Sequence, residues 1–99
     1  DEAVVSAVNL AEVVAKLADR GVPDDFLPRH LAGATLAVVP FDEGEAYAAG
    51  RLRPATRRAG LSFGDLACLA LAISRGAVVL TADRRMAEPA LGLAVRVIR

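Results

Sequence analysis

The sequence predicts a parallel α/β sandwich, in which helices pack on the faces of a sheet of parallel strands. Short apolar runs of strand type lie at residues 3–6, 36–39, 77–81 and 93–98. Segments with apolar residues at helical spacing separate these runs, and each parallel crossover needs such a helix. The 99 residues contain no repeat, low-complexity tract or linker. We therefore expect one domain.

The first strand is predicted to give way to a helix around Ser6, and over residues 9–17 leucine and valine recur at helical spacing. Asn9 and Glu12 have the spacing of a capping pair at its start, so the simplest interpretation of Glu12 is a helix cap. Residues 21–23, Gly-Val-Pro, end this helix. The two aspartates that follow fit solvated caps of a second, short helix.

The single histidine and the single cysteine receive no catalytic role. His30 has no second histidine with which to complete a zinc site, so we expect it on the surface. Cys68 lies within apolar sequence and excludes a disulfide framework, so we expect it to pack in the core.

A group of arginines follows the strand at 36–39 and a helix that begins at Asp42 or Glu43. It consists of Arg51, Arg53, Arg57 and Arg58. These residues fit either a rim that contacts phosphates or solvated cations near a helix end. Basic and acidic residues balance at twelve each, so net charge alone does not indicate a nucleic-acid partner.

Residues 61–83 join a nearly all-apolar helix to a strand. Ser62 and Asp65 have capping-box spacing, so the helix should begin at position 63 or 64, with Asp65 entering a dry environment. Asp83 follows the carboxyl end of the strand, the edge at which open α/β sheets bind ligands. It also fits the cap of a short helix over residues 84–87.

Glu12, Asp65 and Asp83 share a position near a helix start beside apolar sequence, where an unpaired carboxylate is costly. Each acid alone is explained by capping. Three that converge at one sheet edge would suit a hard cation, because Mg²⁺ and Mn²⁺ prefer oxygen ligands. Such a cation commonly orients a phosphate.

Three motifs resemble those of PIN-domain ribonucleases. They are SAVNLAE at residues 6–12, LSFGD at 61–65 and LTADR at 80–84. The segments VVPFDEG and GRLRPATRRAGLS extend the resemblance over essentially the whole chain, and it is closest to VapC-type toxins of type II toxin–antitoxin pairs.

The resemblance implies a three-layer α/β/α fold with a parallel sheet of order 3-2-1-4-5. It implies a metal-dependent endoribonuclease that hydrolyses RNA phosphodiester bonds with Mg²⁺ or Mn²⁺. Glu12, Asp65 and Asp83 match three of the four acidic positions that are catalytic and bind the metal in the family. Ser62 and Thr81 would donate hydrogen bonds to the carboxylates.

The fourth acidic position of the family is an aspartate that ends a first, central strand. This chain opens just before the segment that matches the second strand. We therefore expect residues 1–99 to be a single PIN-like domain that lacks strand 1, as an N-terminally truncated fragment with low stability and weak metal binding.

The resemblance further implies an RNA substrate, a cognate VapB-type antitoxin that docks near the acidic cleft, and a homodimer formed through the outer helices. No segment is long enough to span a membrane, and we expect a cytoplasmic location. The four aromatic residues offer no evident base-stacking platform. The alternative is a catalytically inert PIN-like module that binds RNA or protein, with the acids serving as caps.

Overall fold

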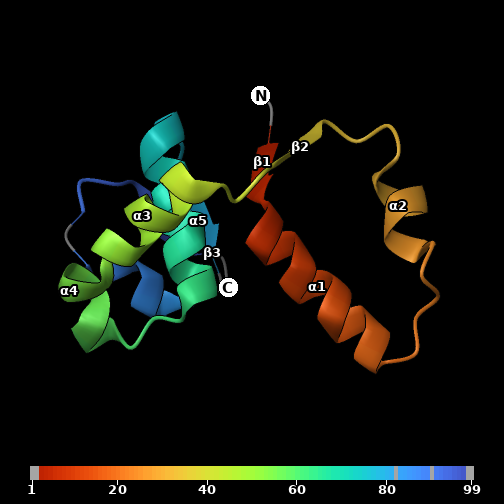
Figure 1. Cartoon of the computed structure of the whole chain (residues 1–99), viewed down its shortest axis with the longest axis horizontal. Helices are drawn as coiled ribbons and strands as arrows, with labels where there is room; N and C mark the ends of the chain where they lie inside the picture. Colours follow the sequence, from red (N-terminus) through yellow and green to blue (C-terminus); the bar gives the residue numbers. More distant parts are fainter. Residues whose placement is uncertain (1–2, 82, 90, 98–99) are drawn as a thin grey trace. The chain divides into compact units, whose positions relative to one another are not determined.

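The chain alternates strands and helices in the predicted order in a computed structural model, which describes residues 3–81, 83–89 and 91–97 (Figure 1). It divides into two compact units, Asp1–Pro40 (unit 1) and Phe41–Arg99 (unit 2). The predicted α/β class with parallel strand pairs is confirmed.

Unit 1 is one parallel strand–helix–strand crossover. Its elements are β1 (Ala3–Ser6), α1 (Ala7–Asp19), α2 (Phe26–Leu31) and β2 (Leu36–Val39). β1 and β2 pair in parallel, with Ala3 opposite Leu36 and Ser6 opposite Val39. In Figure 1 the chain leaves β1 through α1 and returns through α2 to β2.

Helix α1 begins at Ala7, as expected from the change from strand to helix around Ser6, and its N-cap is Ser6 rather than Asn9. The Ser6 side chain accepts a hydrogen bond from the Val8 backbone N–H (3.2 Å). Asn9 Nδ2 instead donates to Glu12 Oε1 (3.1 Å) along the helix surface. The predicted capping pair is therefore a side-chain pair within the helix.

Unit 2 holds the remaining elements. They are α3 (Glu43–Arg51), α4 (Arg53–Thr56), the 3₁₀ turn η1 (Arg57–Ala59), α5 (Phe63–Arg75), β3 (Val79–Thr81), the 3₁₀ turn η2 (Arg84–Ala87) and β4 (Val95–Val97). β3 and β4 pair in parallel with Val79 opposite Val95. Both strands are shorter than predicted, and the predicted strand residue Ile98 lies outside the described residues.

The core of unit 2 forms around α5, as its apolar composition predicts. Leu66 and Leu69 are fully buried, and Ala49 of α3, Val79 of β3 and Met86 of η2 pack in the same cluster. Cys68 packs against this cluster, as predicted. The helix ends at a C-cap glycine in the left-handed conformation (Gly76, φ 60°).

The described strands form two two-stranded sheets, β1-β2 and β3-β4. The expected order 3-2-1-4-5 contains two such pairs, 3-2 and 4-5. The expectation of one domain without strand 1 stays a prediction. No helix within the described residues combines the length and apolar character needed to cross a membrane.

Candidate functional site

Asp65 is fixed at the start of α5 by a capping box. The Ser62 hydroxyl accepts from the Asp65 backbone N–H (3.2 Å), and the Ser62 N–H donates to Asp65 Oδ2 (2.9 Å). Asp65 is half-buried, so the predicted dry environment is wrong. It lies in the first turn, where its carboxylate contacts the backbone of the preceding loop, and the buried surface of the helix continues beyond it.

Asp83 lies between the end of β3 and the start of η2, where the sequence placed it. Its Oδ1 accepts from the Arg85 backbone N–H (3.0 Å), which caps the 3₁₀ turn. The Asp83 N–H donates to Thr81 Oγ1 (3.0 Å). The carboxylate is thus held just beyond the carboxyl end of a parallel strand.

Arg85 forms an ion pair with the Asp83 carboxylate. Its Nη2 lies 2.7 Å from Oδ2, and its Nε lies 3.1 Å from each oxygen. These side-chain hydrogen bonds are the main reason that the pKa of Asp83 is lowered. They also raise the pKa of Arg85, and the charge of Asp65 acts in the same direction. Arg85 is therefore within electrostatic reach of both acids.

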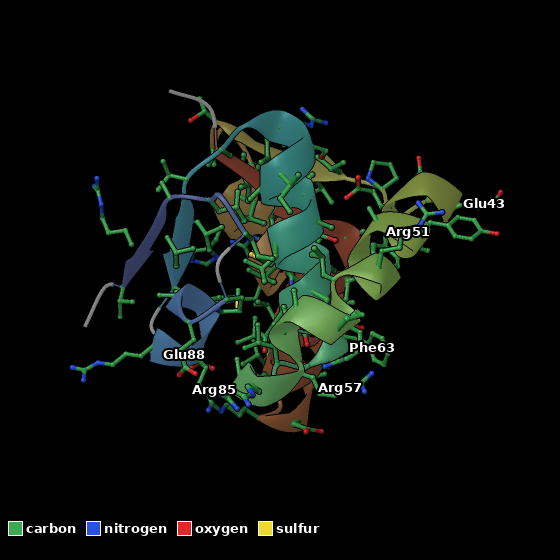
Figure 2. All side chains as sticks on the ribbon, turned by 90° about the vertical axis from the view of Figure 1, so that its left-hand side faces the viewer. Glu43, Arg51, Arg57, Phe63, Arg85 and Glu88 are labelled. Carbon is green, nitrogen blue, oxygen red and sulfur yellow. The ribbon has the colours of Figure 1, made fainter. Side chains whose placement is uncertain are left out.

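Two arginines hold the loop that leads into α5. Arg85 Nη1 donates to the Gly60 carbonyl (3.3 Å), and Arg53 Nη1 donates to the next carbonyl, that of Leu61 (2.8 Å). Because Ser62 follows directly, the loop, the capping box and the Asp83–Arg85 pair are connected. Asp65 and Asp83 therefore belong to one end of unit 2. Figure 2 labels Arg85, which contacts both the loop and Asp83.

Glu12 lies in unit 1, in the second turn of α1, where it is exposed and bonded to Asn9. Within the described residues, no three His, Cys, Asp or Glu side chains are grouped so that they could hold a metal ion. The convergence of all three predicted acids stays a prediction.

The two acids of unit 2 have the donor chemistry of a magnesium or manganese site. Both are half-buried carboxylates that solvent can reach, and Mg²⁺ commonly uses one or two carboxylates together with water and substrate phosphate. Asp65 and Asp83 therefore fit such an ion, provided that some of the hydrogen bonds from Arg85 to Asp83 are broken when it binds. Ser62 and Thr81 differ from the prediction, because their hydroxyls accept from backbone N–H groups of the acids.

One comparison with known protein families found a match. The PIN domain family matches residues 1–91, and the chain belongs to this family. PIN domains are generally metal-dependent nucleases. No curated protein matches the chain.

Two features of the site escaped the sequence analysis. Arg85 was placed in a capped turn without a partner, although its position two residues after Asp83 is a signal for a local ion pair. The sequence did not indicate that Phe63 is 70% exposed beside the capping box. The expectation that the chain lacks an evident base-stacking platform stays a prediction.

Proposed function

We propose that this chain is the nuclease domain of a VapC-type toxin that hydrolyses RNA phosphodiester bonds with Mg²⁺ or Mn²⁺. The observation that carries the proposal is the pair Asp65 and Asp83, fixed at the starts of α5 and η2 and connected through Arg85. Membership of the PIN domain family supports it.

In this proposal Asp65 and Asp83 hold the metal, and Glu12 completes its ligands or orients the attacking water, as the resemblance implies. A metal held there would supply activation of a water molecule and positive charge beside the phosphate. Ser62 and Thr81 fix the backbone of the two acids, which keeps their carboxylates in place. Arg85 is a cation beside them that can contact the scissile phosphate.

The test replaces each acid by its neutral isostere in the full-length protein. Asp65→Asn and Asp83→Asn should abolish Mn²⁺-dependent RNA cleavage and weaken Mn²⁺ binding measured by calorimetry, while the fold is retained. Asp42→Asn is the matched control, because Asp42 caps α3 through its carboxylate (2.9 Å to the Glu45 N–H) and has no place in the proposed site. Cleavage retained in either site variant would contradict the proposal.

We propose further that a cognate VapB-type antitoxin docks near the acids, that the toxin forms a homodimer, and that it acts in the cytoplasm. These proposals follow from the resemblance to VapC-type toxins. Co-expression with the neighbouring small open reading frame, followed by sizing, should yield a complex of the two proteins. A lone monomer would contradict both partner proposals.

The second candidate function is an inert PIN-like binding module. It is favoured by the fact that both acids already serve as caps and that Arg85 neutralises Asp83. This alternative expects the Asp65→Asn variant to lose about 1 kcal/mol of stability through a weakened cap, with no effect specific to Mn²⁺. Melting curves with and without Mn²⁺ separate the two functions.

A further inference from the structure

Phe63 presents an aromatic ring to solvent at the first position of α5. Its side chain is 70% exposed, although the same helix buries most of its other apolar residues. Figure 2 shows Phe63 at the edge of unit 2, on the side that also carries the labelled Arg51 and Arg57.

Arg53 fixes one face of this ring. Its guanidinium carbon lies 4.8 Å from the centre of the Phe63 ring, a cation–π distance. The same guanidinium donates to the Leu61 carbonyl (2.8 Å), so it is anchored to the loop before α5. The arginine therefore orients the phenyl group and leaves the remainder of the ring open.

The ring and the candidate metal ligand share the first turn of α5. Phe63 is its first residue and Asp65 its third, and the capping box with Ser62 holds that turn rigid. A nucleotide bound on the phenyl face therefore lies at the same turn of the helix as the acid, although the two side chains leave the helix in different directions. A second aromatic residue, the exposed Tyr47, is paired in the same way with Arg51 (5.2 Å).

The charge of unit 2 favours a polyanion as the occupant of this surface. Residues 41–99 contain nine arginines against six acidic residues, whereas residues 1–40 contain three basic and six acidic residues. Base stacking on an aromatic ring beside arginines is the common mode of single-strand binding. A flat ring with a planar cation on one face matches a nucleobase better than an apolar protein side chain.

We propose that Phe63 and Arg53 form a binding site for one unpaired nucleobase, which stacks on the open face of the ring and places its neighbouring phosphate at Asp65 and Asp83. The proposal rests on the nuclease function proposed above and adds to it the residues that contact an unpaired base of the RNA. A base-paired nucleotide cannot stack on the ring, so duplex RNA is bound by its phosphates alone.

The test measures RNA binding without metal, so that it is independent of cleavage. The full-length protein is titrated in EDTA with a labelled single-stranded oligonucleotide and with a duplex of the same sequence. Phe63→Leu keeps an apolar side chain and removes the flat ring; it should weaken single-strand binding roughly five- to hundredfold and leave duplex binding unchanged. Ile73→Ala is the control, because Ile73 is an exposed apolar residue (46%) at the other end of α5.

Phe63→Trp supplies a spectroscopic signature. These 99 residues contain no tryptophan, so the new indole is the only one among them. Its fluorescence, after subtraction of the signal of the wild type, should be quenched by the single strand and not by the duplex. This variant should also retain the affinity that Phe63→Leu loses. Unchanged single-strand affinity in Phe63→Leu, or a fluorescence that does not respond at saturating RNA, overturns the proposal.

Two further outcomes assign a failure to its source. If the wild type cleaves RNA and Phe63→Leu binds single strands as well as the wild type does, the proposed base site is wrong and the proposed nuclease function is retained. If single-strand binding depends on Phe63 but the protein does not cleave RNA, only the proposed nuclease function is wrong. If Phe63→Leu loses the antitoxin but not RNA, the ring is a protein-docking residue and the proposal is wrong.

Discussion

The two units of the chain have the same kind of parallel strand pair, yet only unit 2 surrounds its helix with a core. Every buried hydrophobic side chain in the described part of the chain belongs to unit 2. Helix α1 of unit 1, as far as the described residues show, has no buried residue, and Val13 and Val14 are each 47% exposed. Helix α5 has seven buried residues in the same number of turns.

The comparison shows that two helices with similar length and capping can differ in how much tertiary packing stabilises them. Both helices are 13 residues long and begin with a serine cap. Packing against α3, β3 and η2 gives α5 the stabilisation that propensity alone does not provide. The better-packed unit is also the one with the excess of arginine and the acid pair.

The largest expected effect is on stability. Leu66→Ala creates a cavity in the core of unit 2 and should lower the free energy of unfolding by about 2–5 kcal/mol. Val14→Ala in α1 should change it by no more than about 0.5 kcal/mol. Urea unfolding followed by circular dichroism measures both. An equal loss in the two variants would mean that α1 is covered in solution, as in a homodimer.

A smaller effect is expected for the ion pair at the acids of unit 2. Arg85→Gln removes the guanidinium that competes for Asp83, so Mn²⁺ should bind several-fold more tightly in calorimetry. Arg84→Gln removes the same charge one residue away and serves as the control. If both variants bind Mn²⁺ equally tightly, the general positive charge of unit 2 is responsible rather than the contact with Asp83.

The smallest effect concerns pH. The pKa of Asp83 is lowered in the folded chain, chiefly by the side-chain hydrogen bonds from Arg85. Its contribution to stability is therefore fully present above the ordinary aspartate pKa of about 4 and is lost as the pH falls through the lowered value. Wild type and Asp83→Asn should differ in unfolding free energy at neutral pH and converge below about pH 4. A constant difference down to pH 2 would contradict this assignment.

The sequence predicted those parts of the fold that local chemistry determines. The strand at Ala3–Ser6, the capped start of α5 at Phe63 and the cap of Asp83 on the following turn were all predicted from side-chain type and spacing. Membership of the PIN domain family was expected from the resemblance of motifs along the chain to those of PIN-domain ribonucleases, and it is confirmed.

What the sequence did not predict depends on tertiary contacts. The exposure of Phe63 follows from where the first turn of α5 meets the surface, and Arg53 reaches it from another helix. The bond from Arg85 to the Gly60 carbonyl spans 25 residues. The half-buried state of Asp65 likewise depends on the packing of the loop before it, which apolar composition does not encode.

Asp65 has a structural role and a proposed metal-binding role, and both require an aspartate at this position. Its carboxylate closes the capping box of the helix on which the core of unit 2 is built, and it is also the acid proposed to hold the metal. A lineage that abandoned catalysis would still gain from keeping this aspartate, since losing it weakens the helix start. Under the proposed function, inactive variants of this protein should therefore carry substitutions at Glu12, which caps no helix, more often than at Asp65. The presence of Asp65 in a variant sequence is then weak evidence that the variant is active.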